Sequence, residues 1–507
     1  MRRFLILMAA FWAASSLPAS PARAEWRRAV STHFIVYSEG SPQDVRAAAE
    51  RLERFDGVLR RLSPSPPRET PVKLTVFMPR TRDRIGDMFG SENVAGFYRG
   101  DIEGPFVVAP RLTLSRTFTA DVLLFHEYTH HFMLQNFSTP YPAWFVEGYA
   151  ELLSNTRFED DGTVTIGSFA DHRSRELGLT PPAIRSLLFH TQREMRGTDI
   201  FSFYANAWLL THYLVISDQR PGQLGRYIAG IAQGRPPEQA ATEAFGDLDA
   251  LQRDFLHYRR SLYIPTISIR FDQVPPVGPI TLETLSPAED AIVWLQARAR
   301  KGVRPDDLPG FARDVRARAA AAPNDPATLQ LLADTEYLAK DFPAATRAVD
   351  ALLAIQPDAP RALLRRGLIE VQLLDDGHIE DAARWTAARD WIRRANRAAP
   401  DDPLILLEYY RAFERQQAGA PPSNANAGLA RAYELAPQDL ELRASYAQVL
   451  IRQRRYREAV TVLAPVAYAP HQNAGSEAAG RLIDMIRGLA DGSERPREQA
   501  AAGAPPR

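Results

Sequence analysis

The chain contains no cysteine in its 507 residues. Disulfide bonds, thiolate ligands for a metal ion and a lipid-modified N-terminal cysteine are therefore excluded. A metal site must use imidazole and carboxylate groups, and histidine is also scarce, with ten residues. Three of these histidines and one glutamate lie within residues 126–131, in the string HEYTHH. This segment is the first candidate for a functional site.

An excess of charge of either sign is also absent. Lysine plus arginine and aspartate plus glutamate each number 61, so the formal net charge is zero and nothing global indicates binding to nucleic acid. The hydrophobic fraction of 45% and the charged fraction of 24% are those of globular proteins. The length predicts two or three domains.

No apolar run reaches the roughly 20 residues that a membrane-spanning helix requires. The run FLILMAAFWAA at residues 4–14 follows two arginines and precedes Ala22-Arg23-Ala24. These are the parts of a secretory signal peptide, so we expect residues 1–24 to be removed after Ala24, with an uncleaved anchor as the alternative. Together with the composition, this predicts an exported protein, periplasmic in a Gram-negative bacterium.

Residues 25–270 mix strand and helix patterns, which predicts an α+β domain. Residues 33–38 and 72–78 are rich in β-branched and aromatic residues and are predicted strands. Apolar residues spaced at three and four predict helices at 43–62, 119–137, 143–155, 201–218 and 247–263. The proline-rich segment 271–283 is the predicted linker.

A short proline motif recurs after the linker. It occurs as APNDP (322–326), QPDAP (356–360), APDDP (399–403) and APQDL (436–440), so successive prolines are 34, 43 and 37 residues apart. A period near 34 is the length of a tetratricopeptide repeat, which consists of two antiparallel helices. We expect an all-α tetratricopeptide solenoid over residues 284–487, with generic helical hairpins as the alternative. A disordered tail is expected at 488–507.

The spacing of His126 and His130 suits a metal site. Residues four apart on a helix share a face, so both imidazoles can bind one ion. Glu127 lies one position further round, beside the ion. Zinc lowers the pKa of a bound water towards about 7, and a neighbouring carboxylate can accept its proton. His131 is about 100° round the helix from His130 and is expected to point away.

The next predicted helix, WFVEGYAEL at 144–152, supplies two glutamates. Catalytic zinc commonly takes two histidines and a glutamate, and Glu147 follows His130 by 17 residues, enough for a second helix to return. Glu151 lies one turn further on, where it can accept a hydrogen bond from a ligating histidine. Two carboxylates on this apolar helix would be costly to bury without a cation.

HExxH followed by E-G-x-A-E resembles the gluzincin zinc metallopeptidases, most closely the peptidase-MA-like bacterial families with W-F-x-E-G-x-A-E. The resemblance covers roughly residues 25–265, and its specific part is 126–151. It implies a gluzincin-like metallopeptidase fold in which His126, His130 and Glu147 bind Zn²⁺ and Glu127 is the general base. Glu151 would support the site, although thermolysin has an aspartate there.

The resemblance implies two further roles. Gluzincins stabilise the oxyanion with a tyrosine or histidine from a later helix, and Tyr204 matches that tyrosine, with packing against Trp208 as the alternative. His212 is a weaker match. An edge strand before the zinc helix pairs with extended substrate in this clan, which makes Phe106, Val107, Val108 and Ala109 candidates for substrate binding. An ordinary interior strand is the alternative.

Two functions follow from these patterns. The first is an exported zinc-dependent peptidase that cleaves a peptide or protein substrate, with the solenoid binding substrate or a partner protein. The second is a non-catalytic envelope scaffold that works through the concave surface of the solenoid. The intact HExxH motif favours the peptidase, because a scaffold has no need of Glu127. No G-x-M-E-N string of the aminopeptidases is present, which slightly favours an endopeptidase.

Overall fold

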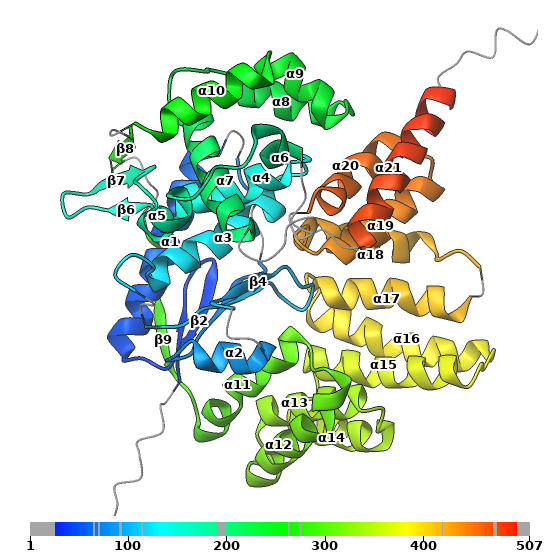
Figure 1. Ribbon diagram of the computed structural model, residues 1–507. Helices are drawn as coiled ribbons and strands as arrows, with labels where there is room; N and C mark the ends of the chain where they lie inside the picture. Colours follow the sequence, from blue (N-terminus) through cyan, green and yellow to red (C-terminus); the bar gives the residue numbers. More distant parts are fainter. Residues whose placement is uncertain are drawn as a thin grey trace, which may run out of the picture.

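The computed structural model describes residues 26–63, 66–68, 71–90, 94–112, 115–189, 199–261, 264–270, 272, 276–417, 419–469 and 474–493. The expected signal peptide lies outside the described residues, as does most of the expected tail. The described chain is largely helical, with a mixed sheet near the N-terminus followed by a long series of helices (Figure 1). None of the described helices combines the length and the apolar character needed to span a bilayer.

A six-stranded sheet forms the base of the N-terminal part, with the strand order β4-β5-β3-β2-β1-β9. Its strands are β1 (Arg27–Val30), β2 (Phe34–Ser38), β3 (Leu74–Met78), β4 (Phe97–Arg99), β5 (Phe106–Val108) and β9 (Thr281–Thr284). β3 pairs in parallel with β2 and β5, and the other pairings are antiparallel. β2 and β3 confirm the two predicted strands, and β3 is buried along its whole length, as expected of a central strand.

β5 is an interior strand of this sheet. It pairs with β3 on one side and with β4 on the other, and the side chains of Phe106, Val107, Val108 and Ala109 are all buried. The expectation that this segment is an edge strand open to substrate is therefore wrong, because its backbone is already paired on both sides. The preceding strand β4 is joined to β5 by residues 100–105 and forms this edge of the sheet, so β4, like β9 at the opposite edge, has one side unpaired in the sheet.

Three helices carry the segments singled out in the sequence: α3 (Ala120–Asn136), α4 (Ala143–Ser154) and α7 (Asp199–Val215). Thr119 caps the start of α3, because its hydroxyl accepts a hydrogen bond from the backbone N–H of Val122 at 3.3 Å. α3 buries apolar side chains against α1 (Pro42–Leu62) and the sheet, while α4 packs between α3 and α7. α4 thus lies at the centre of the helical layer.

The rest of the N-terminal part surrounds these helices. A small antiparallel sheet has the order β6-β7-β8. Its strands are β6 (Arg157–Phe158), β7 (Thr163–Ile166) and β8 (Ile267–Arg270). The other helices are α2 (Asp83–Phe89), the 3-10 turn η1 (Asp171–Arg173), α5 (Ser174–Leu177), α6 (Ile184–Phe189), α8 (Gln223–Ala232), α9 (Pro237–Phe245) and α10 (Leu248–Arg259).

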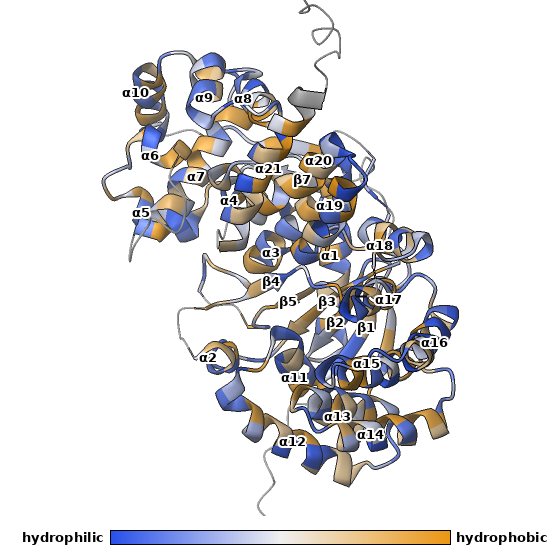
Figure 2. Cartoon of the chain, turned by 90° about the vertical axis from the view of Figure 1, so that its right-hand side faces the viewer, coloured by the Kyte–Doolittle hydropathy of each residue, from blue (hydrophilic) through white to orange (hydrophobic). Residues whose placement is uncertain are grey.

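The C-terminal part is a tetratricopeptide-like series of helices, α11 to α21, that runs as an arc along one side of the N-terminal part (Figure 1). Successive pairs pack together, among them α13 with α14, α15 with α16, α17 with α18 and α19 with α20. The helices are α11 (Pro287–Lys301), α12 (Leu308–Ala321), α13 (Pro326–Leu338), α14 (Phe342–Ile355), α15 (Pro360–Asp376), α16 (Ala382–Ala398), α17 (Pro403–Gln416), α18 (Ser423–Leu435), α19 (Leu440–Arg452), α20 (Tyr456–Ala467) and α21 (Ala474–Ser493). Figure 2 shows both hydrophilic and hydrophobic residues on these helices, as expected of helices that bury one face.

The recurring proline motif is the helix-start signal of these pairs. Asp325, Asp402 and Asp439 immediately precede α13, α17 and α19, and each carboxylate accepts backbone N–H bonds from the first helical turn. Pro326 and Pro403 occupy the first helical position, where no N–H is required. The motif therefore repeats because each pair of helices needs a turn followed by a capped start.

Two predicted boundaries differ from the structure. The expected linker overlaps β9, which pairs with β1, so the chain returns to the N-terminal sheet before the first repeat helix begins. α21 continues to Ser493, which places the first residues of the expected tail in a helix. α11 also packs on the sheet, where Trp294 stacks on Trp26 with ring centroids 6.2 Å apart. The repeats are therefore continuous with the N-terminal core.

The far end of the repeats docks on the N-terminal part through a buried arginine. Arg443 of α19 is 1% exposed and donates hydrogen bonds to the backbone oxygens of Leu134 at 2.8 Å and Phe137 at 3.4 Å. These carbonyls lie at the C-terminal end of α3, where they lack helical partners and favour a cation. Asp439 adds a second contact, because its Oδ2 accepts a hydrogen bond from the backbone N–H of Ile102 at 2.8 Å.

Gly148 allows α4 and α7 to pack closely. A Cβ added at this position would overlap the Thr211 hydroxyl and the backbone of Ala207, both on α7. Gly148 lies next to Glu147, between the two glutamates of α4, and the close approach of α7 explains why a glycine occupies this position. The position of Glu147 therefore depends on the absence of a side chain at residue 148.

We expect Gly148→Ala to lower the free energy of unfolding by about 1–3 kcal/mol, because overpacked helices must shift apart. Chemical denaturation checks this value. The matched control is Gly225→Ala on α8, where an added Cβ meets no atom within 4 Å. That control should be neutral or raise stability by up to about 1 kcal/mol, since alanine favours helix. Equal stability of the two variants would contradict the packing argument.

Candidate metal centre

Two histidines of α3 and one glutamate of α4 converge on one point. The Nε2 atoms of His126 and His130 are 3.1 Å apart, and Glu147 Oε2 lies 3.5 Å from the first and 3.4 Å from the second. Glu147 is fully buried and His130 is 8% exposed. The structure therefore brings together the three residues predicted as metal ligands, from positions one turn apart on α3 and from the adjacent helix.

The three separations fit a tetrahedral ion. A tetrahedron with centre-to-corner distances of about 2.0–2.1 Å, as in zinc sites, has edges of about 3.3–3.4 Å. The observed edges of 3.1, 3.4 and 3.5 Å lie close to that length. Two imidazoles and one carboxylate are also a donor set that zinc favours. The residues present therefore fit a zinc ion in both geometry and chemistry.

The charges at this point also favour a cation. Burial lowers the pKa of His126, but the hydrogen bond to Glu147 and the charges of Glu151, Glu127 and Glu147 outweigh burial and raise it to about 9. The site thus stabilises positive charge on or near His126. A proton on this imidazole and a metal ion between the imidazoles are alternative ways to meet the same requirement.

Glu151 lies behind the ligand triangle and is held by three groups. Its Oε1 is 3.4 Å from His126 Nδ1, its Oε2 is 2.9 Å from His172 Nε2, and Arg173 donates to Oε1 at 2.5 Å. Burial raises the pKa of Glu151, but the Arg173 charge and the His172 hydrogen bond lower it well below its ordinary value. Glu151 is therefore an anion that orients His126.

His172 and Arg173 were not identified from the sequence. Both lie in the short helix η1, directly before α5, 21 and 22 residues after Glu151. The adjacent pair His-Arg is a weak signal without a motif around it. The sequence did indicate that such residues are needed, because a second buried carboxylate on α4 requires cationic partners of its own.

Glu127 and Tyr204 face the same space as the ligands. Both line one cavity with His126, His130 and Glu147, and both are half-buried. The rings of Tyr204 and His126 are 6.4 Å apart, and the Arg173 guanidinium lies 5.2 Å from the Tyr204 ring centroid. Burial and then the charges of the neighbouring glutamates raise the pKa of Tyr204 well above its ordinary value, so its phenol stays protonated.

The other two histidines near the site have different partners. His131 Nδ1 lies 3.0 Å from the hydroxyl of Tyr98, and burial lowers the pKa of His131 to about 3, so this ring is neutral. His212 is completely buried between the Tyr258 hydroxyl at 2.8 Å and the Gly167 carbonyl at 2.9 Å. Neither histidine lines the cavity of the ligands.

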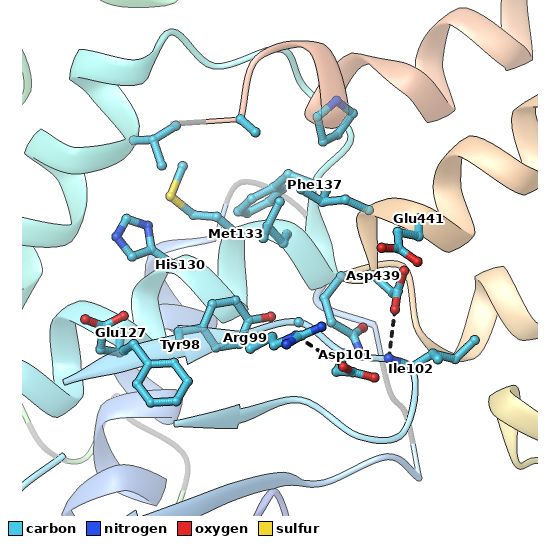
Figure 3. Close-up of a pocket in the computed structure, with 18 of the residues that line it drawn as sticks. Tyr98, Arg99, Asp101, Ile102, Glu127, His130, Met133, Phe137, Asp439 and Glu441 are labelled. Carbon is cyan, nitrogen blue, oxygen red and sulfur yellow. Dashed lines mark hydrogen bonds and ion pairs between the residues drawn. The ribbon is translucent and has the colours of Figure 1, made fainter. Parts of the chain in front are cut away.

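The cavity beside the ligands lies between the N-terminal part and the repeats. It has a volume of about 790 Å³ and reaches from α3 and β4 to α17, α19 and the end of α20. In Figure 3, Glu127 and His130 lie at one end and Asp101, Ile102, Asp439 and Glu441 at the other, with Tyr98 and Arg99 between them. The repeats therefore supply one wall of the site.

A second group of potential ligands lies on the far side of α3. The ligand atoms of His33, Glu53 and Asp56 lie within 4.8 Å of one another. Arg60 already compensates this group, since its Nε donates to Asp56 Oδ2 at 2.6 Å and its guanidinium lies 3.1 Å from His33 Nε2. Tyr128 of α3 donates to Asp56 at 2.6 Å. This arrangement is an ion-pair network that supports α3.

Comparison with known proteins adds little to this description. No protein-family model matches the chain, and no curated protein matches it. Solved structures that are similar include a MamA RS-1 ArsTM double mutant (14% identity, TM-score 0.25) and MamA 41-end from Desulfovibrio magneticus RS-1 (14%, 0.26). A crystal structure of MamA has 12% identity and a TM-score of 0.25. They cover 40–41% of this chain and 97–98% of their own, and at these TM-scores the likeness carries no argument.

The His33 network should make stability depend on pH. Burial lowers the pKa of His33, but the Glu53 hydrogen bond and the charges of Asp56 and Glu53 raise it above the ordinary value of 6.5. Its contribution to stability is complete below pH 6.5 and is lost as pH rises through the folded-state pKa. We expect His33→Gln to reduce the decline in unfolding free energy above pH 6.5, measured by denaturation at several pH values. His257→Gln on the exposed side of α10 should leave the decline unchanged.

Proposed function

We propose that this protein is a zinc-dependent peptidase of the gluzincin type, with His126, His130 and Glu147 as zinc ligands. One observation carries the proposal: three donor atoms from two helices lie 3.1–3.5 Å apart, as the corners of a zinc tetrahedron would. The neighbouring glutamate in the same cavity supports a catalytic role over a purely structural metal site.

Zinc in such a site polarises a substrate carbonyl and lowers the pKa of water towards about 7. Glu127 accepts the proton of the attacking water and then passes it to the leaving amine, as general base and general acid. It is suited to this role because it lies in the cavity one residue after a ligand and takes no part in the ligand triangle. Glu151 keeps the His126 ring oriented through its contact with Nδ1.

Tyr204 supplies the hydrogen bond to the oxyanion that develops on the substrate. Its phenol is protonated, lies in the same cavity and comes from α7, which packs against the helix of Glu147. A donor held in a buried site stabilises developing negative charge without reorganisation. The edge strand β4 lines the same cavity and has one unpaired side in its sheet, so it replaces β5 as the candidate for pairing with extended substrate.

The proposal includes export to the periplasm, which rests on the signal-peptide pattern of residues 1–24. It also includes binding of a substrate or partner protein by the repeats. The observation behind this part is that α17, α19 and α20 line the cavity of the ligands.

Protein binding without catalysis is a second candidate function. It is favoured by a separate cavity of about 620 Å³ between the sheet and the helices α11, α12, α13 and α15, lined by Tyr37, Phe77 and Phe311 among others. A scaffold that uses this inner surface has no need of a base beside the histidines. The substitution Glu127→Gln separates the two functions, because a scaffold keeps its activity in cells whereas a peptidase loses it.

We expect the purified protein to hold one zinc ion per chain, and Glu127→Gln to retain zinc while reducing peptide cleavage by about 10²–10⁴-fold. Metal analysis and cleavage of peptide libraries measure both quantities. The matched control is Glu238→Gln on the exposed start of α9, which should cleave peptides like the wild type. Absence of stoichiometric zinc, together with unchanged cleavage by Glu127→Gln, would refute the proposal.

Tyr204→Phe should reduce kcat by about 10²–10³-fold, because the oxyanion loses one hydrogen-bond donor, while zinc content and KM stay close to those of the wild type. Steady-state kinetics on the best library peptide tests this. Tyr213→Phe is the control on the same helix, since the Tyr213 hydroxyl accepts a hydrogen bond from Arg220 and does not line the cavity. If both variants are equally active, Tyr204 serves packing only.

A further inference from the structure

The wall of the cavity opposite the candidate ligands carries acceptor groups from two parts of the chain. Gln438, Asp439 and Glu441 lie at the start of α19, and Asp101 lies in the loop after β4. We name these four residues the acidic wall. Figure 3 shows Asp101, Asp439 and Glu441 at the end of the cavity away from Glu127 and His130.

Negative charge exceeds positive charge on this side of the cavity. Only two arginines and no lysine are among the described residues that line it, and each arginine already has a carboxylate partner. Arg99 lies 3.2 Å from Asp101, and Arg411 lies 2.8 Å from Glu408. Among the described residues, neither Asp439 nor Glu441 forms an ion pair with lysine or arginine. Within the acidic wall, Asp439 and Glu441 are thus the carboxylates without a paired cationic side chain among the described residues.

Gln438 provides an independent sign that a ligand belongs here. Gln438 is 1% exposed and is one of the residues that line the cavity, yet its side-chain Oε1 has no hydrogen-bond partner among the described residues. An unpartnered buried amide oxygen is costly, and native proteins retain few of them. A hydrogen-bond donor brought into the cavity would satisfy this oxygen.

Asp439 shows that the carboxylates crowd one another. Burial raises its pKa, the backbone N–H groups of Leu442 and Ile102 lower it, and the charges of Asp101 and Glu441 raise it, with a result of about 6. Each of its oxygens already accepts one backbone hydrogen bond, at 2.7 Å from Leu442 and 2.8 Å from Ile102. Asp439 is therefore fixed in place, and a cation beside it would relieve the repulsion.

We propose that the acidic wall binds a positively charged nitrogen group of the peptide substrate, either a lysine or arginine side chain or a free amino terminus. This inference rests on the proposed function, because it treats the cavity from His126 to Asp439 as one peptide-binding site. Ammonium and guanidinium groups offer three to five donors and no acceptor, which matches the carboxylates of the wall and the unpartnered amide oxygen of Gln438. The repeats then select substrates and do not merely tether them.

A small metal ion fits the acidic wall less well. Among the described residues, only the groups around His126 and around His33 bring three potential ligand atoms within 4.8 Å of one another. The acceptors of the acidic wall are spread more widely than that. An organic cation with several N–H groups spans such a spacing, whereas a bare ion cannot.

The test measures binding of fluorescent peptides to full-length Glu127→Gln protein loaded with zinc, so that cleavage does not interfere. Peptides of one sequence carry a central lysine, norleucine or glutamate, each with a free or an acetylated amino terminus. We expect the cationic peptides to bind at least about ten-fold more tightly than uncharged ones. Adding Glu441→Lys should remove this preference, and adding Glu458→Lys, an exposed glutamate on α20 outside the cavity, should not.

A second variant separates binding from folding. Gln438→Leu removes the unpartnered acceptor while keeping the size of the side chain, so it should leave Tm unchanged or raise it, yet weaken binding of the cationic peptides several-fold. If lysine and norleucine peptides bind alike, or Glu441→Lys has no more effect than Glu458→Lys, the acidic wall is not a binding site. Loss of binding on acetylation alone assigns the wall to the amino terminus, and dependence on the central residue assigns it to the side chain.

The two proposals can fail separately. One outcome refutes only the peptidase proposal: wild-type protein cleaves no peptide, yet Glu127→Gln protein prefers cationic peptides and loses this preference with Glu441→Lys. The proposal for the acidic wall is then supported. If wild-type protein cleaves peptides with no regard to their charge, the acidic wall falls and the peptidase stands.

Discussion

The burial of two carboxylates on one apolar helix governs the arrangement of this molecule. Glu147 and Glu151 are 0% and 1% exposed, and a buried anion is stable only beside cations or hydrogen-bond donors. Glu151 obtains them from His172 and Arg173. Glu147 faces the two imidazoles of α3 instead, where the same requirement is met by a proton or by a metal ion. The candidate site exists because Glu151 is paired with these cationic side chains whereas Glu147 faces the imidazoles.

Close helix packing makes this burial possible. Gly148 lets α7 approach α4, and α7 also carries Tyr204 into the cavity. On the opposite side of α3, Tyr128 ties the helix to Asp56 and the His33 network. α3 is therefore held on both sides by side chains that are far apart in the sequence, so its histidines keep one orientation relative to α4.

The repeats belong to the same structural unit as the site. α11 packs on the N-terminal sheet through Trp294, and α19 returns to α3 through Arg443, which binds carbonyls at the helix end. The arc between these two contacts brings α17 and α19 over the cavity (Figure 1). Because the wall opposite the ligands comes from the repeats, whatever the cavity binds meets both halves of the chain.

Local patterns made much of this architecture predictable. Helices α1 and α3, strands β2 and β3 and the capped starts of the repeat helices could be predicted. Each depends on residues a few positions apart, so the spacing of apolar residues or of the proline motif indicates it directly. The convergence of the three candidate ligands was also predictable, since His126 and His130 are one helical turn apart and Glu147 is on the next helix. The interior position of β5 was not, because pairing on both sides depends on where β4 folds back.

The sequence by itself thus determined the long helices of the N-terminal part, the helical repeats and which imidazoles and carboxylates can share an ion, because these depend on local spacing. Only the tertiary structure decided that His172 and Arg173 hold Glu151, that β9 rejoins the sheet and that α19 closes the cavity with Gln438, Asp439 and Glu441. Those contacts join segments from about 20 to more than 300 residues apart, and no local pattern records which distant surfaces meet when the apolar faces are buried.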